Sequence, residues 1–160
     1  MKVLTQKICL VGDFGVGKTS LIRRFVDRSF SDQYLATVGV KISRKLVNLT
    51  PDVAVQLVIW DLEGSTKFQA VNATYLQGAA GAIIVADATR PDTIAHIANH
   101  CQQFHRINPA KPIVIALNKH DLLTGNPPTV PQAYLTSAKT GYGVDELFYE
   151  LSRQIGGEAP

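Results

Sequence analysis

Residues Gly12 to Thr19 have the types and spacing of a phosphate-binding loop, G-x-x-x-x-G-K-[ST]. Glycines at these positions let successive backbone N–H groups approach phosphate oxygens, where a Cβ would obstruct them. Lys18 adds a positive charge, and the Thr19 hydroxyl suits Mg²⁺. We therefore expect a nucleoside di- or triphosphate to be bound by Asp13, Phe14, Gly15, Val16, Gly17, Lys18, Thr19 and Ser20.

The flanks of this loop argue against the alternative, an ordinary glycine-rich turn. The apolar run 8–11 before it is typical of a buried strand. After it, Leu21, Ile22, Phe25 and Val26 have the spacing of one helix face. The motif requires this order of strand, loop and helix.

The remaining chain alternates apolar runs with helical patterns. Extended stretches are expected at 39–49 and 53–60, joined by a turn at 50–52, and buried strands at 82–86, 113–117 and 134–136. Helices are expected over 94–104, ended by Pro109, and over 147–155. The predicted fold class is α/β, a doubly wound, six-stranded, mostly parallel sheet with helices on both faces.

Length and composition indicate one domain spanning residues 1–160. The 160 residues are 46% hydrophobic and 18% charged, which is typical of a soluble globular protein. A scattered net charge of +3 disfavours nucleic acid as a partner. Cys9 and Cys101 have no metal or redox spacing and are expected to be reduced core thiols. Without a signal sequence or long apolar span, the expected location is cytoplasmic.

Polar residues follow the strands at the ends where this fold class binds ligands. They are Asp61, the segment 118–121 (Asn-Lys-His-Asp) and the segment 137–139 (Ser-Ala-Lys). Together with the phosphate loop, these motifs resemble those of the Ras-like small GTPases, whose G domain is a P-loop NTPase fold. The resemblance spans Lys7 to Ile155, and the region Tyr34 to Val40 is most similar to the Rab branch.

Asp121 predicts guanine as the base. A carboxylate accepts hydrogen bonds from N1–H and N2–H₂ of guanine, whereas adenine presents an acceptor at N1. The resemblance implies that Asn118 braces the loop, that Lys119 lies on the ring, and that Ala138 N–H reaches the guanine oxygen. Two alternatives stay open, a core position for Phe30 and a turn or helix-capping role for Asp121. The implied guanine site comprises Phe30, Asn118, Lys119, Asp121, Ser137, Ala138 and Lys139.

The resemblance also implies GTP or GDP with Mg²⁺ as cofactors, and two switch loops. Thr37 is expected to contact both magnesium and the γ-phosphate, with an edge-strand threonine as the alternative. Gly64 would offer its N–H to the γ-phosphate. The expected metal site is Thr19, Thr37 and Asp61. Release of the loops on loss of this phosphate would change the surface that partners contact.

Three residues depart from the family pattern. Ser65 stands where the family has the glutamine that orients the attacking water, so the catalytic residue is unknown and intrinsic hydrolysis is expected to be slow. Glu63 replaces a small residue, and it either points to solvent or directs the water. Phe14 replaces a small residue in the phosphate loop. It either obstructs an activator's arginine or turns outward against the second switch loop.

A fourth departure concerns shape, since residues 124–132 are too few for the family helix before the last strand and three of them are prolines. A partner, a second copy or a tightly packed loop must then cover the sheet there, and we expect a homo-oligomer contact near Thr124 to Tyr134. The tail lacks a cysteine for prenylation, which predicts no direct lipid anchor and a bacterial or other non-prenylated setting.

Two classes of function remain open at this point. One is a guanine-nucleotide switch with slow or partner-assisted hydrolysis, read by an effector through Tyr34, Ile42 and 68–76 and served by an exchange factor and an activating protein. The other is a nucleotide-loaded interaction scaffold that hardly hydrolyses. An ATP-dependent kinase is disfavoured because no catalytic base or acceptor site is found.

Overall fold

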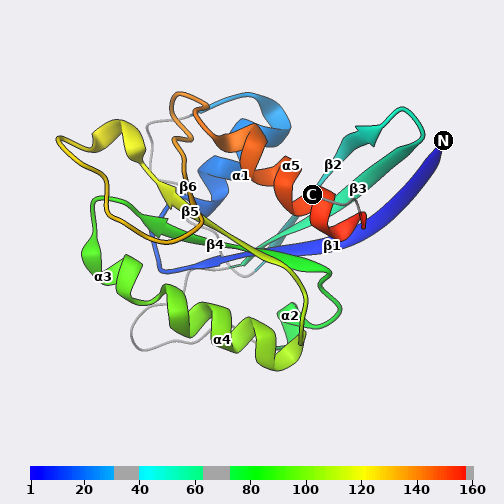
Figure 1. Cartoon of the computed structure of the whole chain (residues 1–160), viewed down its shortest axis with the longest axis horizontal. Coiled ribbons are helices and arrows are strands. Elements are labelled where there is room, and N and C mark those ends of the chain that lie inside the picture. Colours follow the sequence, from blue (N-terminus) through cyan, green and yellow to red (C-terminus); the bar gives the residue numbers. More distant parts are fainter. Residues whose placement is uncertain (31–39, 63–72, 158–160) are drawn as a thin grey trace.

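One six-stranded sheet, in the order β2-β3-β1-β4-β5-β6, forms the centre of the molecule (Figure 1). The computed structural model describes residues 1–30, 40–62 and 73–157. The strands are β1 (Lys2–Gly12), β2 (Val40–Thr50), β3 (Val53–Leu62), β4 (Gly81–Asp87), β5 (Ile113–Asn118) and β6 (Ala133–Leu135). The predicted α/β class and six-stranded sheet are confirmed.

The strand directions bring the predicted site to one edge of the sheet. β2 and β3 are antiparallel, and all other neighbours are parallel. The register pairs Leu10 with Asp61, and Asp87 with Asn118. Because parallel strands end at the same edge, the residues after β1, β3, β4 and β5 converge there.

Helices cover both faces, as predicted (Figure 1). On one face lie α1 (Lys18–Asp27) and α5 (Val144–Ile155). On the other lie α2 (Ala73–Leu76), α3 (Pro91–Ala95) and α4 (Ile97–Ile107). The helix expected over 94–104 is therefore two helices, interrupted at His96. None of the helices in the described ranges is both long and apolar enough to cross a membrane.

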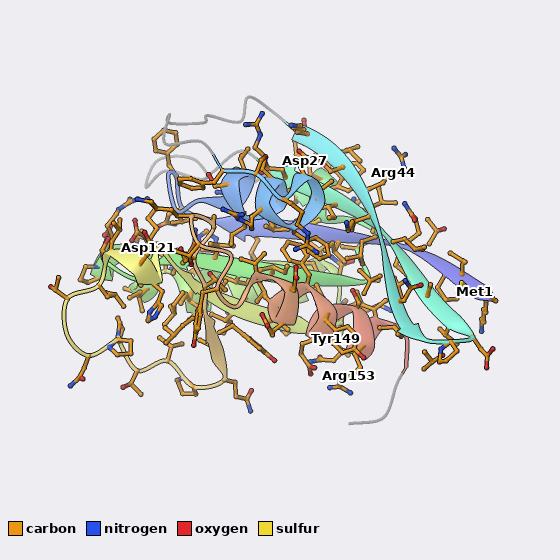
Figure 2. All side chains as sticks on the ribbon, turned by 90° about the horizontal axis from the view of Figure 1, so that it is seen from above. Met1, Asp27, Arg44, Asp121, Tyr149 and Arg153 are labelled. Carbon is orange, nitrogen blue, oxygen red and sulfur yellow. The ribbon has the colours of Figure 1, made fainter. Side chains whose placement is uncertain are left out.

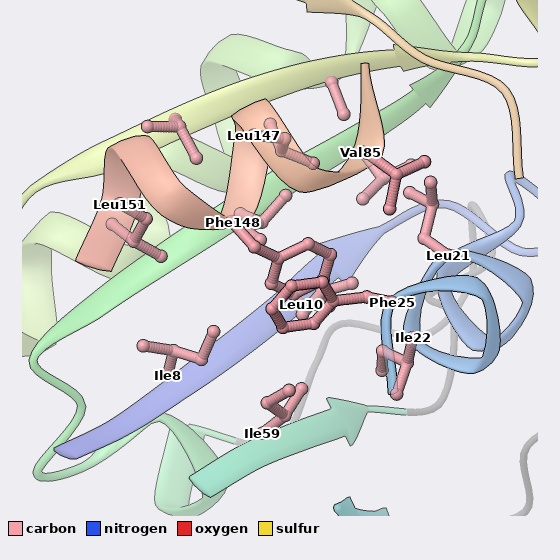
Figure 3. Close-up of a cluster of buried hydrophobic side chains, with 14 of the residues drawn as sticks. Ile8, Leu10, Leu21, Ile22, Phe25, Ile59, Val85, Leu147, Phe148 and Leu151 are labelled. Carbon is pink, nitrogen blue, oxygen red and sulfur yellow. The ribbon is translucent and has the colours of Figure 1, made fainter. Parts of the chain in front are cut away.

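The first core lies between the sheet and the pair α1 and α5. Phe25 of α1 and Phe148 of α5 stack with ring centroids 4.0 Å apart and planes 3° from parallel (Figure 3). Leu21 and Ile22 share the buried face of α1, and Leu151 shares that of α5. This packing fixes the start of α1 relative to the strand ends, where the phosphate loop lies.

The second core lies beneath α2 and α4. Phe104 is fully buried in it, beside Leu76 and Cys9. Asn108, directly after α4, donates a hydrogen bond of 2.7 Å to the carbonyl of Leu76. This bond ties the end of α4 to α2. Cys9 and Cys101 are both free thiols, as expected.

The predicted loss of a helix before the last strand is confirmed. Residues 123–132 contain no helix and lead from the short 3-10 helix η1 (His120–Leu122) to β6. Leu123 and Val130 pack against the second core. Apart from Val130 and the half-buried Pro128, residues 124–132 are exposed. The homo-oligomer contact near Thr124 to Tyr134 stays a prediction.

Candidate functional site

The phosphate loop is held by its carbonyl groups. Five successive backbone carbonyls of the loop each accept a hydrogen bond of 2.9–3.2 Å from a lysine, arginine or asparagine side chain. Lys18 Nζ bonds the carbonyls of Gly12 and Asp13, Arg90 Nη1 bonds Phe14, Lys119 Nζ bonds Gly15, and Asn118 Nδ2 bonds Val16. The C=O and N–H of one peptide point in opposite directions, so the N–H groups face away from these donors. This arrangement suits an anion cradle.

Three glycines make this shape possible. A Cβ on Gly17 would lie 2.3 Å from Asn118 Nδ2, and one on Gly12 would lie 2.3 Å from the carbonyl oxygen of Val85. Gly17 and Gly15 have φ angles of 102° and 76°, which favour glycine. The loop then enters α1 at Lys18, and a helix N-terminus attracts an anion.

Lys18 is a buried cation at the base of the cradle. It is 6% exposed, and its Nζ lies 3.2 Å from both carbonyl oxygens that it contacts. Burial lowers the pKa of Lys18 to about 8, and the charges of Asp61 and Asp13 partly oppose this effect. A phosphate beside Nζ would restore the charged form, so the site fits a polyphosphate.

Two oxygen ligands suited to Mg²⁺ lie next to the cradle. The Thr19 hydroxyl donates a hydrogen bond of 2.6 Å to Asp61 Oδ2, and Asp61 is 2% exposed. Hydroxyl and carboxylate oxygens are the hard ligands that Mg²⁺ takes alongside phosphate oxygens. They form part of the wall of a cavity of about 240 Å³ between α1 and the β2–β3 hairpin. Its lining residues are Thr19, Ile22, Arg23, Val26, Asp27, Lys41, Ser43 and Asp61.

The segment predicted to bind guanine lies at the ends of β5 and β6. Figure 2 shows Asp121 near one end of the molecule and Met1 near the other. The buried Ser137 hydroxyl donates a hydrogen bond of 2.7 Å to Asp121 Oδ1. Asn118 Oδ1 accepts a hydrogen bond of 3.1 Å from Thr136. The Asp121 side chain is therefore oriented by Ser137.

Arg24 of α1 holds the segment 137–139 through its backbone carbonyls. Its Nε donates a hydrogen bond of 2.7 Å to the carbonyl of Ala138, and its Nη2 donates to the carbonyl of Lys139. Fixing these carbonyls orients the backbone N–H groups of the segment. Arg24 was not expected from the sequence, since 114 residues separate it from Ala138.

Three of the residues predicted to bind nucleotide have exposed side chains. Phe30 is 36% exposed, so its alternative position in the core is excluded. Lys139 is exposed as well. Phe14 is 48% exposed, although its backbone carbonyl is bonded to Arg90. The predicted alternative, packing of Phe14 against the second switch loop, concerns residues 63–72, which lie outside the described part of the chain.

Several predictions concern residues that the structure does not describe. Tyr34 and Thr37 fall in 31–39, and Glu63, Gly64, Ser65 and Phe68 fall in 63–72. The expected roles of Thr37 and Gly64 at the γ-phosphate therefore stay predictions, as does the effect of Ser65.

Asp87 is a further polar residue at the ends of the strands, and its place directly after the apolar run 82–86 could have indicated it. It is buried at the end of β4, and its Oδ2 lies 3.0 Å from Lys119 Nζ. Its Oδ1 accepts hydrogen bonds from the backbone and hydroxyl of Thr89. The rule that drew attention to Asp61, a polar residue directly after an apolar run, also applies to Asp87.

Two histidines beyond β4 also reach the phosphate loop. His96 Nδ1 lies 2.5 Å from Asp13 Oδ2, and His100 Nε2 lies 2.8 Å from Asp13 Oδ1. Burial would raise the pKa of Asp13, but the hydrogen bonds with His96 and His100 outweigh it and the pKa is lowered. The same contact with Asp13 raises the pKa of His96.

Comparison with known proteins gives the same family as these motifs. The family model described as "Ras of Complex, Roc, domain of DAPkinase" matches residues 7–121. The chain is 35% identical to human Ras-related protein Rab-22A, over 97% of this chain and 86% of that protein. It is 32% identical to tobacco Ras-related protein Rab5, over 95% and 82%, and 35% identical to bovine Ras-related protein Rab-4A, over 93% and 73%. The chain therefore belongs to the Ras-like small GTPases, a family of GTP-binding switches, and Rab proteins are among its relatives.

Proposed function

We propose that this chain is a guanine-nucleotide switch that binds GTP and GDP with Mg²⁺ and hydrolyses GTP slowly, or only with a partner. The observation that carries the proposal is the joined site. Asn118 donates to the phosphate loop at Val16, while Asp121, three residues later, is oriented by Ser137. The phosphate loop and the segment that we expect to read the base are thus joined by a direct hydrogen bond.

Asp121 selects the base. Its carboxylate accepts from the N1–H and N2–H₂ of guanine, and an adenine there would leave a charged acceptor facing a lone pair. Ser137 keeps this carboxylate in position by donating to Oδ1. Sites built on such bonds discriminate by about 10⁴-fold or more.

Lys18, Thr19 and Asp61 serve the phosphates and the metal. The Lys18 ammonium is held at the base of the cradle and neutralises phosphate charge. The Thr19 hydroxyl would bind Mg²⁺ directly and the Asp61 carboxylate would hold it through a water, with Thr37 as the expected third group. A bound Mg²⁺ would supply positive charge that stabilises the charge developing on the phosphate groups during transfer.

Slow hydrolysis follows from residues that orient water poorly. The Ser65 side chain is too short to position an attacking water as a glutamine amide does. Phe14 places a large ring at the exposed rim, on a backbone that Arg90 holds in place. An arginine inserted by an activating protein would therefore meet a bulky side chain at position 14, where other members of the family have a small residue. Slow hydrolysis is expected whichever of its two expected roles Glu63 has, facing solvent or directing the water.

An effector surface is proposed on the β2–β3 hairpin. Ile42 is exposed on β2 and pairs in register with Trp60 of β3, and Tyr75 of α2 lies beside Trp60 with ring centroids 6.4 Å apart. These side chains flank the two segments expected to respond to nucleotide. An effector, an exchange factor and an activating protein would act here from the cytoplasm.

The second candidate is a nucleotide-loaded scaffold with negligible hydrolysis. It is favoured by Glu63, Ser65 and Phe14, whereas Lys18, Thr19 and Asp121 serve binding in either case. The two candidates differ in turnover and not in affinity.

Single-turnover hydrolysis of GTP loaded onto the purified protein separates them. We expect slow phosphate release, quickened by cell extract, and at least tenfold faster release by Ser65→Gln. Asp121→Asn serves as a control for loading, because it removes guanine recognition. Absence of phosphate release from the wild type, with extract and without it, would leave the scaffold as the function.

A further inference from the structure

The side chain of Asp13 points away from the phosphate cradle, toward the junction of α3 and α4. Each of its two oxygens meets a histidine ring, His96 at 2.5 Å and His100 at 2.8 Å. The two histidines are four residues apart, and the backbone N–H of His100 bonds the carbonyl of His96 at 3.1 Å. They therefore face Asp13 from adjacent turns.

The two rings differ in their surroundings. His100 is almost fully buried, with a side chain 9% exposed, whereas the side chain of His96 is 43% exposed. A carboxylate only accepts, so His96 presents Nδ1–H and His100 presents Nε2–H to it. His96 is placed to exchange protons with solvent, and His100 is placed as a fixed donor.

Asp13 connects these rings to the phosphate-binding lysine. Its carbonyl oxygen accepts a hydrogen bond of 3.2 Å from Lys18 Nζ, and its charge favours the protonated form of Lys18. The neighbouring carbonyl, that of Phe14, is held by Arg90, directly before α3. The loop is thus braced at two successive residues by the α3–α4 region.

We propose that His96 and His100 are positioning residues that hold the phosphate loop in its binding shape through Asp13, and that protonation of His96 strengthens this hold. The inference rests on the proposed guanine-nucleotide binding and adds a control of it. Nucleotide would be retained more firmly in mildly acidic solution, and the α3–α4 junction would be mechanically coupled to the phosphate site.

The direction of the pH effect follows from the groups around His96. The hydrogen bond with Asp13 raises the pKa of His96, the charges of Asp13 and Asp92 add to this, and slight burial opposes it. Among the residues that the structure describes, His100 also contacts Asp13, and the charge of Asp13 acts on Lys18. As the pH falls from 8 to 6, a larger fraction of His96 carries its charge, and in that fraction the contact with Asp13 is an ion pair. Lys18 becomes more fully charged over part of the same range, so variants must separate the two effects.

The test is the dissociation rate of a fluorescent GDP analogue from the loaded protein between pH 6 and pH 8. His96→Asn and His100→Gln together keep an N–H donor near each contacting ring nitrogen but cannot titrate. His96→Ala and His100→Ala together remove both donors. His105→Gln is the matched control, because His105 is an exposed histidine of α4 that contacts Lys111 instead.

We expect the alanine pair to release the analogue about tenfold faster at pH 7, as for the loss of charge-assisted hydrogen bonds. The Asn and Gln pair should stay within about threefold of the wild type, and should lose the part of the pH dependence that His96 contributes. Equal rates for the wild type and the alanine pair would overturn the proposal, as would an unchanged pH dependence in the Asn and Gln pair.

A second measurement keeps this inference separate from nucleotide binding itself. NMR titration of the His96 ring, in the protein as purified, should give a lower pKa in Asp13→Asn than in the wild type. In the Asp13→Asn background, the two alanine substitutions should have little further effect on dissociation. If the wild type fails to bind the analogue, the proposed function fails. If it binds but the titration of His96 is indifferent to Asp13, the positioning role fails alone.

Discussion

The side-chain amide of Asn118 donates a hydrogen bond of 3.0 Å to the carbonyl oxygen of Val16, and joins the end of β5 to the phosphate loop. A Cβ on Gly17 would occupy the position of this amide. The segment that is expected to read the base is therefore in direct contact with the phosphate loop, and a change in either should disturb both.

Asn118→Ala should weaken nucleotide binding by loosening this joint. It leaves the Val16 carbonyl without its side-chain donor and the Thr136 hydroxyl without its acceptor. Loss of such buried partners costs about 1–3 kcal/mol each, so we expect at least tenfold faster dissociation of bound GDP. Asn48→Ala, on the exposed edge strand β2, is the control. Equal rates for the two variants would contradict a bracing role.

Asp121→Asn should change which base is bound. An amide in place of the carboxylate loses the charged acceptor for guanine, and the expected loss of affinity for GDP is about 3 kcal/mol. Xanthine has a carbonyl where guanine has its amino group, so the amide N–H₂ of the variant can donate to it. Competition of GDP and xanthosine diphosphate for the variant measures this exchange. Unchanged GDP affinity would refute the assignment of Asp121.

The sequence predicted the framework of this site because the framework is local. Apolar runs predict the buried strands β4 and β5, and the polar residues directly after them, such as Asn118, must lie at the sheet edge where ligands bind. The missing helix before β6 also follows from local facts, the length of the segment 124–132 and its prolines.

The side-chain hydrogen bonds that hold the loop could not be predicted, because each depends on where segments distant in the sequence meet in the fold. Arg90 lies 76 residues from Phe14, and His96 lies 83 residues from Asp13. Nothing near these residues distinguishes them from ordinary surface side chains. β1 is also longer than the run 8–11, because Lys2 and its neighbours pair with β3 although they are mostly polar or exposed.

Arg24→Ala should weaken guanine binding, although Arg24 itself is not expected to contact the nucleotide. The side chain bonds the carbonyls of Ala138 and Lys139, and without it the segment expected to contact guanine loses its support on α1. Hydrogen bonds from a charged donor contribute about 1.5–3 kcal/mol, so we expect roughly a tenfold loss of GDP affinity by titration calorimetry. Arg44→Ala on β2 is a control of equal charge. The same affinity in both variants would show that the segment holds its shape unaided.

Lys18 gives a prediction about pH. Burial lowers its pKa to about 8 when no phosphate is bound, with Asp61 and Asp13 partly opposing this. Binding of phosphate requires the charged form, so the contribution of Lys18 to GDP affinity should be constant below about pH 7 and should fall as the pH rises above 8, by up to about tenfold per unit. Affinity measured by fluorescence titration from pH 6.5 to pH 9.5 tests this. A level profile across that range would mean that Lys18 keeps its proton.

The stability of the nucleotide-free protein should respond in the opposite direction. A lysine has a pKa near 10.4 in the unfolded chain, which is above the folded value of about 8 for Lys18. Between these two values the unfolded state binds more protons, so the free energy of unfolding contributed by Lys18 rises with pH in that window and is constant below it. Lys18→Met removes the titrating group, and urea unfolding of both proteins at pH 8 and pH 10 isolates its share. If the free energy of unfolding of the variant rises between pH 8 and pH 10 as much as that of the wild type, groups other than Lys18 cause the increase.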